Sequence, residues 1–328
     1  MSSADRVSVS LTALLSAAAI APIVALQTSL PAEAAGFSQI YAFGDSLVDT
    51  GNTFAKTGIP PEPYFAGRFS NGPIWNEYLA SDLNVAETSL GFGGALSNEA
   101  GLVLFGGVPI APVPGTLSQV NSFAANPMGV DPNALYVIWA GANDYFFAGQ
   151  TNPLEPVGNL QEAVTILSGA GAENFLLVNL PDLGSLPLVG LRGLPPETVA
   201  GLNALSSAHN QALAATVAGL NAGDNINVDL LDANGLFKSA LAGDLGFTNT
   251  TDACTLNPIC VADPTVQDTY LFWDEVHPTT AAHRVLADSA LALVHPDVAA
   301  VPEPTGVISL VLVGGLGLYQ LSRRRSAS

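Results

Sequence analysis

Apolar segments of the kind that form buried strands alternate along this chain with longer segments of helical spacing. The clearest strand candidate is Ala134–Ala140. Such alternation favours a parallel sheet covered by helices on both faces, because each parallel connection crosses back over the sheet. The sequence therefore predicts an α/β fold. The other predicted strands are Ile40–Phe43, Asn174–Leu180 and Ile226–Leu231, and the predicted helices begin at Pro73, include Leu160–Leu167 and Glu197–Leu220, and run from Thr279 to about Val294.

Two of these strands are followed at once by a polar residue in a turn. Ser46 comes directly after Gly44 and Asp45, and Asn143 comes after Gly141. Because the carboxyl ends of parallel strands meet at one edge of the sheet, where open α/β sheets bind ligands, both side chains are expected at such an edge. Taken alone, each segment is equally consistent with an ordinary turn, since Gly, Asp and Ser are common turn residues.

Composition argues against two kinds of partner. The formal net charge is −19 at pH 7. Such a surface repels the phosphate backbone of nucleic acids, so nucleic-acid binding is not expected. The four histidines are scattered along the chain, and its two cysteines are too few to complete a metal site. The sequence therefore predicts no metal centre.

Residues 1–35 have the composition of a secretory signal peptide. An apolar run from Val7 to Leu26 is followed by the small-residue segment Ala32-Glu33-Ala34-Ala35, which resembles a cleavage site. A transmembrane anchor is the alternative interpretation. The domain that follows is predicted to occupy residues 36–300.

Residues 301–328 also have the composition of a targeting segment. Val301-Pro302-Glu303-Pro304 precedes the apolar stretch Thr305–Leu321 and then three arginines, Arg323–Arg325. The stretch is at the lower length limit for a membrane span, and the arginines predict a cytoplasmic end. The order resembles the PEP-CTERM tail, which dedicated sorting machinery processes in exported bacterial proteins. A plain C-terminal anchor is the alternative. Both imply an extracellular or cell-surface domain.

Four short segments occur in an order that is typical of one family of hydrolases. They are Gly44–Leu47 (GDSL), Gly91–Ala95 (GFGGA), Gly141–Asp144 (GAND) and Asp274–Pro278 (DEVHP). Together they resemble the sequence blocks of the GDSL, or SGNH, serine esterases and lipases. Three longer segments, LLVNLPDLGSLPL, FTNTTDAC and WDEVHPTTAAHRVLAD, resemble the lipase/acylhydrolase branch of that family. The resemblance implies a three-layer α/β/α sandwich around a flavodoxin-like parallel sheet of about five strands.

The resemblance also implies a role for each block. Ser46 would be the nucleophile, His277 the base that takes its proton, and Asp274 the carboxylate that orients the imidazole. The oxyanion would be held by the N–H groups of Ser46 and Gly94 and by the Asn143 side chain. The implied activity is hydrolysis of a carboxylic ester through an acyl-enzyme, without a metal or organic cofactor.

Two alternatives to a hydrolase remain. The same site could transfer an acyl group to an alcohol, or the chain could be a non-enzymatic surface or matrix protein that keeps the esterase fold. The complete set of site residues argues against the second. Lipids, short acyl esters and acetylated polysaccharide all remain open as substrates.

Some residues near the blocks leave a choice. Ser89 stands where the family's second block has Asn, so the register at Gly94 could differ by one position. His209 lies inside a predicted helix and is expected to be structural. His283 lies inside the last predicted helix and is a weaker candidate base than His277.

Three further expectations concern the regions between the blocks. Arg68 is expected to pair with a nearby acid. The Gly- and Pro-rich apolar segment Gly101–Pro114 is predicted to be a loop, either a lip over an acyl-binding groove or a buried connector. Export makes a disulfide between Cys254 and Cys260 plausible.

Overall fold

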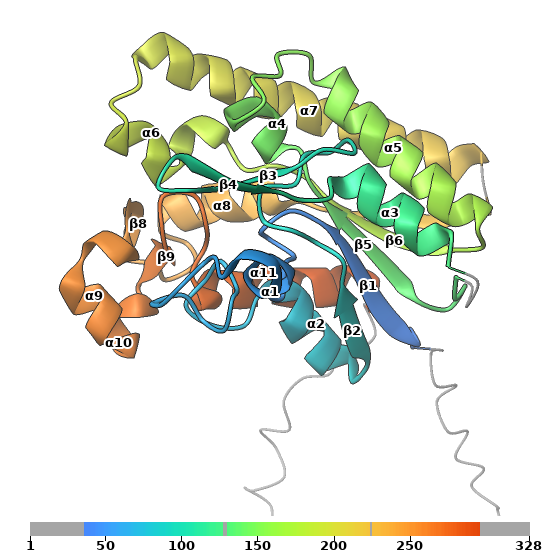
Figure 1. Cartoon of the computed structure of the whole chain (residues 1–328), viewed down its shortest axis with the longest axis horizontal. Coiled ribbons are helices and arrows are strands. Elements are labelled where there is room, and N and C mark those ends of the chain that lie inside the picture. The colour runs from blue at the N-terminus through green and yellow to red at the C-terminus, as the bar shows by residue number, and fades with distance from the viewer. Residues whose placement is uncertain (1–35, 127–129, 224, 296–328) are drawn as a thin grey trace, which may run out of the picture. The chain divides into compact units, whose positions relative to one another are not determined.

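The computed structural model describes residues 36–126, 130–223 and 225–295 (Figure 1). The predicted signal peptide and the predicted sorting tail both lie outside these residues. Among the helices described, none has the length and apolar character needed to cross a bilayer.

A sheet of five parallel strands lies at the centre of the fold and confirms the predicted α/β class. Its spatial order is β2-β1-β5-β6-β7. Four of its strands match the predicted ones to within two residues at each end. The five strands are β1 (Gln39–Gly44), β2 (Ala86–Ser89), β5 (Leu135–Trp139), β6 (Asn174–Val178) and β7 (Asn227–Leu231).

Helices cover both faces of this sheet, as the alternation of segments predicted. Successive side chains of a strand point to opposite faces, so Val137 and Trp139 of β5 pack in one core cluster and Tyr136 and Ile138 in the other. The first cluster includes residues of α2 (Trp75–Leu83), α8 (Ala233–Ala242) and α11 (Thr280–Val294), and the second those of α3 (Thr116–Ala124), α5 (Leu154–Gly169) and α7 (Pro196–Gly223). The result is a three-layer sandwich (Figure 1).

Short elements follow the sheet strands and surround its carboxyl edge. The last helix begins where it was predicted, because the Thr279 hydroxyl accepts a hydrogen bond from the Ala282 N–H and caps its first turn. The remaining elements are α1 (Asn52–Thr57), β3 (Leu102–Phe105), β4 (Val108–Pro112), α4 (Ala142–Phe146), η1 (Leu183–Ser185), α6 (Pro187–Leu191), β8 (Asn249–Ala253), η2 (Cys254–Leu256), α9 (Pro258–Ala262), α10 (Pro264–Gln267) and β9 (Tyr270–Phe272).

The segment Gly101–Pro114 is a β-hairpin, and the prediction of a loop was wrong. β3 pairs antiparallel with β4 across a turn at Gly106 and Gly107, both of which have positive φ. The prolines in β4 concealed the strand, because proline is confined to strand edges and bulges. Most of the hairpin is exposed, which also excludes the buried connector.

The edge strand β2 carries a half-buried acid that should make stability depend on pH. Glu87 accepts a hydrogen bond from Asn76 at 2.8 Å, and burial raises the pKa of Glu87 from 4.5 to about 7. The folded state therefore favours the protonated carboxyl. The stability that the protonated Glu87 carboxyl contributes is fully present below 4.5, which is the pKa of this group in the unfolded chain. It is lost as the pH rises through about 7, which is its pKa in the folded state.

We expect Glu87→Gln to flatten this pH dependence. The amide cannot ionise, so the melting temperature of the variant relative to wild type should increase between pH 5 and pH 8. Glu162→Gln removes the same charge from an exposed position on α5 and serves as the control. A difference from wild type that is equal at both pH values would contradict the assignment.

Candidate active site

The turn after β1 places Ser46 at the carboxyl edge of the sheet. Gly44 has φ 141°, and a Cβ atom there would lie 1.9 Å from the Trp139 carbonyl oxygen. Glycine is therefore required where β1 and β5 end side by side. The Asp45 carboxylate accepts a hydrogen bond from the Leu47 N–H at 3.0 Å and closes the turn around Ser46.

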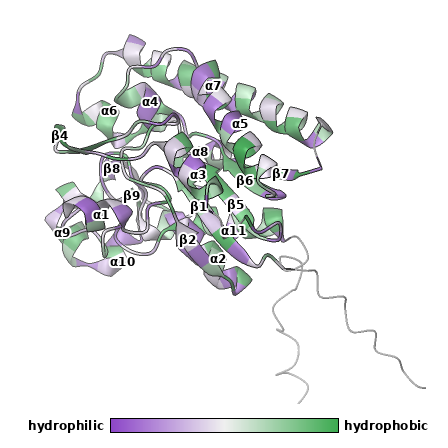
Figure 2. Cartoon of the chain, turned by 45° about the vertical axis from the view of Figure 1, so that its right-hand side comes forward, coloured by the Kyte–Doolittle hydropathy of each residue, from purple (hydrophilic) through white to green (hydrophobic). Residues whose placement is uncertain are grey.

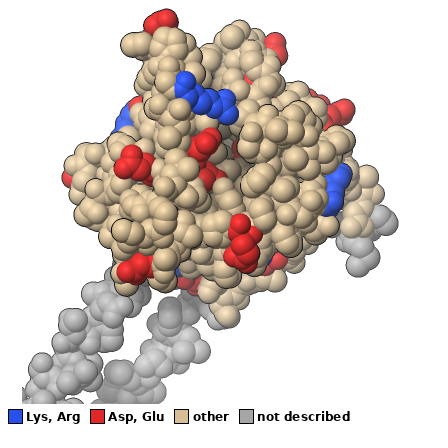
Figure 3. Space-filling model, turned by 60° about the vertical axis from the view of Figure 1, so that its left-hand side comes forward, with Lys and Arg blue, Asp and Glu red and all other residues tan. Residues whose placement is uncertain are grey.

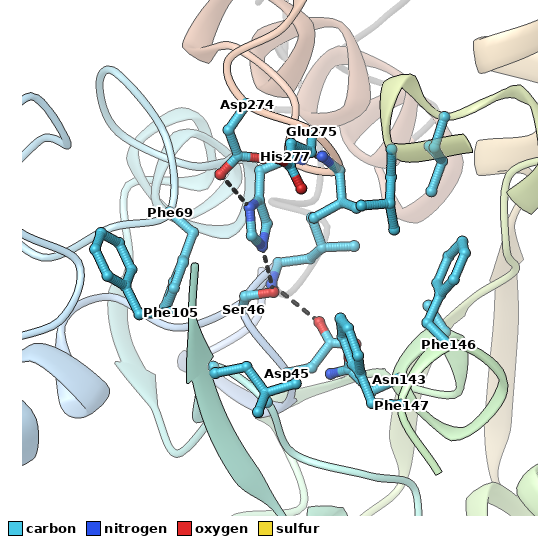
Figure 4. Close-up of a pocket in the computed structure, with 18 of the residues that line it drawn as sticks. Asp45, Ser46, Phe69, Phe105, Asn143, Phe146, Phe147, Asp274, Glu275 and His277 are labelled. Atoms are coloured by element: carbon cyan, nitrogen blue, oxygen red, sulfur yellow. Dashed lines mark hydrogen bonds and ion pairs between the residues drawn. The ribbon is translucent and has the colours of Figure 1, made fainter. Parts of the chain in front are cut away.

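Ser46, His277 and Asp274 form a continuous line of hydrogen-bonded side chains (Figure 4). His277 Nε2 lies 2.8 Å from Ser46 Oγ, and His277 Nδ1 lies 2.7 Å from Asp274 Oδ2. These are hydrogen-bonding distances for a nucleophile, its base and the group that orients the base. Residues 231 positions apart in the sequence thus meet at one point.

The loop that carries Asp274 and His277 is fixed by the Asp274 carboxylate itself. Its Oδ1 accepts hydrogen bonds from the N–H groups of Val276 at 2.9 Å and His277 at 2.8 Å. Burial works to raise the pKa of Asp274, but the His277 charge and these hydrogen bonds outweigh it and hold the pKa below its ordinary value. Asp274 is therefore an ionised carboxylate at neutral pH.

The candidate oxyanion-hole residues lie around the same point. Asn143 is in the first turn of α4, directly after β5, and its Nδ2 donates a hydrogen bond to the Ala95 carbonyl at 2.9 Å. An amide nitrogen carries two hydrogens, so this contact orients the group and leaves a second donor. Asn143, Gly94, Ser46 and His277 all line one cavity.

Gly94 is fixed by both its backbone and its neighbours. Its φ is 84°, and a Cβ atom would lie 2.2 Å from the Leu102 carbonyl oxygen. The N–H of Gly93 donates to the Asp49 carboxylate at 2.9 Å and to the Thr53 hydroxyl at 2.7 Å. Because the Gly93 donor is already engaged, the register that assigns the oxyanion role to Gly94 is the better supported one.

The sequence did not indicate two aromatic residues that contact the base and its carboxylate. The Tyr64 hydroxyl donates to Asp274 Oδ2 at 2.8 Å, and the ring of Phe69 lies 5.0 Å from the His277 ring, centroid to centroid. Burial raises the pKa of Tyr64, so its phenol stays protonated. Tyr64 ends the Pro-rich segment Pro60–Tyr64, and Phe69 lies in the segment Gly67–Gly72, but neither pattern identifies the partners of these side chains.

Tyr64→Phe should shift the acid limb of kcat/KM to higher pH. Without the phenol, the Asp274 carboxylate has one donor fewer and stabilises the protonated imidazole more strongly, so freeing the base requires a more alkaline solution. The measurement is the pH–rate profile on a soluble ester. Tyr78→Phe removes a hydroxyl that lies 2.7 Å from Thr280 and outside the cavity lining, and is the matched control. An unchanged acid limb would show that Tyr64 only packs.

His209 and His283 lie outside this site. His209 Nδ1 is 2.9 Å from the Tyr145 hydroxyl, and burial lowers the pKa of His209 to about 4. His283 is also buried, and burial lowers its pKa to about 3. Both are therefore neutral at ordinary pH, and neither lines the cavity.

The remaining sequence predictions concern groups at or beyond the edge of the site. Arg68 pairs with Glu77, at 2.6 Å between nitrogen and oxygen. Cys254 and Cys260 form a disulfide between η2 and α9. No group of three or more potential ligands that could hold a metal occurs in the part of the chain that the structure describes.

The cavity that contains the Ser46 hydroxyl has a volume of about 520 Å³. This is within the range of small-molecule sites. Its walls are mainly apolar, with contributions from β3, α4, η1, α6 and η2. Ser46, His277 and Asn143 lie close together in its wall (Figure 4), and the other polar residues of the lining include Glu275, Thr255 and Arg192. The arrangement combines a nucleophile, a base and amide donors with an apolar binding space.

Comparison with known proteins places this geometry in a family. The family model described as GDSL-like Lipase/Acylhydrolase matches residues 40–290. Among curated relatives, the thermolabile hemolysin of Vibrio parahaemolyticus is 30% identical over 77% of this chain, which spans 63% of that protein's length. The phosphatidylcholine-sterol acyltransferase of Aeromonas hydrophila is 27% identical over 83% of this chain and 94% of that protein.

A third relative, the acetylesterase of Thermothelomyces thermophilus, is 28% identical over 80% of this chain and 90% of its own length. The match to the family model covers all four sequence blocks, from the turn with Ser46 to the loop with His277. The protein is an enzyme of the carboxylic ester hydrolase class, and its chain belongs to the GDSL-like lipase/acylhydrolase family.

Proposed function

We propose that the protein hydrolyses carboxylic esters through an acyl-enzyme on Ser46. The observation that carries this proposal is the hydrogen-bonded line from Ser46 Oγ through His277 to Asp274, at 2.8 and 2.7 Å. His277 removes the hydroxyl proton as Ser46 Oγ attacks the ester carbonyl carbon. Asp274 holds the imidazole in the tautomer whose Nε2 is free to accept that proton.

Negative charge then develops on the former carbonyl oxygen. The N–H groups of Ser46 and Gly94 and the amide of Asn143 stabilise this charge. When the tetrahedral intermediate collapses, the proton on His277 passes to the departing alkoxide, which leaves as an alcohol. Water repeats the sequence on the acyl-enzyme, releases the carboxylic acid and restores Ser46.

Transfer of the acyl group to an alcohol is the second candidate function. It is favoured by the similarity to an acyltransferase over 94% of that protein's length. Turnover of a soluble aryl ester, with and without an added alcohol acceptor, separates the reactions by the ratio of free acid to new ester. The absence of both products would contradict the proposed function and leave a non-catalytic protein.

The domain is also proposed to act outside the cytoplasmic membrane. The targeting character of both chain ends and the Cys254–Cys260 disulfide support this, since disulfides persist in oxidising compartments. We expect the mature protein from its native host to lack residues 302–328 after processing at the P-E-P site. Intact-mass measurement tests this, and a mass that includes Arg323–Arg325 would indicate a plain anchor.

A further inference from the structure

The β3–β4 hairpin exposes apolar side chains and contains no polar residue. Residues 101–114 read GLVLFGGVPIAPVP. The exposed fractions are 40% for Phe105, 59% for Val108 and 45% for Ile110. Antiparallel strands that face water normally alternate apolar with polar residues, and this hairpin does not. The hydropathy colouring of Figure 2 shows the strong apolar character of β4.

The hairpin stands at the mouth of the cavity that contains Ser46. Residues 102–107 line that cavity, and Val108 pairs with Phe105 just beyond it. Phe147, at the end of α4, and Leu256, in η2, line the same cavity and are 43% and 60% exposed. Exposed apolar side chains from three separate segments therefore surround one opening. We name Phe105, Val108, Ile110, Phe147 and Leu256 the mouth patch.

We propose that the mouth patch docks the enzyme on the uncharged surface of a lipid aggregate, from which an ester-bearing chain enters the cavity. This rests on the proposed esterase function and specifies its substrate class as esters held at a lipid–water interface. The patch is continuous with the apolar cavity, so a chain leaving the lipid need not cross water to reach Ser46. Exposed apolar area of this kind marks an interaction surface.

Charge decides which lipid surface fits. The patch contains no charged residue, and the chain carries a formal net charge of −19. An anionic bilayer attracts basic residues and repels such a protein. Figure 3 shows the side that carries α6 and α9, where uncharged atoms predominate and several acidic side chains and a few basic ones also lie at the surface. A zwitterionic surface such as phosphatidylcholine is therefore the expected partner, bound by insertion of apolar side chains.

An indole placed in the patch reports docking at that position. The three native tryptophans are almost fully buried, so an added exposed tryptophan dominates any change in emission. With phosphatidylcholine vesicles, Val108→Trp should shift its emission to the blue and be quenched by brominated lipid. Leu154→Trp, at a position that is 66% exposed on α5 and outside the cavity lining, should do neither. This test needs no turnover, so it is independent of the proposed chemistry.

Charge substitutions test the consequence for catalysis. The double variant Val108→Asp/Ile110→Asp should hydrolyse an ester dispersed in phosphatidylcholine vesicles about tenfold more slowly than wild type, because buried apolar area sets the strength of interfacial binding. Neither position lines the cavity, so its rate on soluble p-nitrophenyl acetate should stay within about twofold. Leu154→Asp/Leu293→Asp adds the same charge elsewhere and should match wild type on both substrates.

Several results would overturn the proposal. If the emission of Val108→Trp does not change when phosphatidylcholine vesicles are added, or shifts only with anionic lipid, a zwitterionic surface is excluded as the partner. A blue shift that grows with protein concentration in the absence of lipid would assign the patch to a second copy of the chain. An emission that is already blue-shifted in highly diluted protein without lipid would indicate that another segment of the same chain covers the mouth patch. If Val108→Asp/Ile110→Asp lost the same fraction of its rate on soluble and on dispersed ester, the hairpin would act by shaping the cavity and not by docking on lipid.

Discussion

Ser46→Ala is expected to abolish ester turnover, with a loss on the order of 10⁶ in kcat if this line of residues behaves as other serine triads do. The reason is geometric, because Ser46 Oγ is the hydroxyl that lies 2.8 Å from His277 Nε2. The substitution should leave the fold intact, since the Ser46 side chain lies at the cavity and outside the core clusters.

Ser122→Ala provides the control for this loss, because Ser122 is an exposed serine on α3. It should retain wild-type kcat, and both variants should melt close to wild type. A Ser46→Ala protein that still turns over ester at more than a few per cent of the wild-type rate would show that another nucleophile acts.

Asn143→Ala is expected to lower kcat by about 10²–10³, or roughly 3–4 kcal/mol, with a smaller change in KM. Asn143 is held by the Ala95 carbonyl at 2.9 Å, so its amide is oriented before substrate arrives. Its interaction strengthens only as the oxyanion forms, and the loss therefore appears in the chemical step.

Asn143→Asp makes the complementary comparison, because it replaces a donor with a carboxylate of the same shape. Its kcat should fall further than that of Asn143→Ala, since negative charge would then face the forming oxyanion. If Asn143→Ala raised KM and left kcat unchanged, Asn143 would be a substrate-binding residue and would not belong to the oxyanion hole.

The sequence predicted the sheet well where a strand is buried on both faces. Every residue of β5 is buried, so its segment is apolar throughout and easy to recognise. The sequence did not predict β2, because β2 is an edge strand whose side chains are exposed or half-buried. Its residues, Ala86-Glu87-Thr88-Ser89, carry no apolar periodicity to distinguish them from a loop.

The candidate site was largely visible in the sequence because its groups lie in short segments at strand ends. Ser46 and Asn143 each follow a recognisable strand, and Asp274 and His277 are only three residues apart. Tyr64 was missed because it meets Asp274 across 210 positions. No local sequence pattern indicates such a contact, because it forms only when the loop that contains Tyr64 folds against β9.

The hairpin was missed for a different physical reason. Its Gly and Pro residues are turn formers, and its apolar residues follow neither a helical period nor strict alternation. Val103 is buried while its neighbours on both strands are mostly exposed. A strand whose two faces both carry apolar residues resembles a buried segment in sequence, although here most of it faces outward.

Mapping the adduct of a fluorophosphonate probe by peptide mass spectrometry tests the role of Ser46 most directly. A covalent phosphonyl group forms only on a nucleophile that its base has activated. The proposed mechanism predicts one adduct, on the peptide that contains Ser46, formed rapidly in wild type, slowly in Asn143→Ala and not at all in Ser46→Ala. An adduct on a different residue, or ester turnover by a wild-type enzyme that the probe does not label, would contradict it.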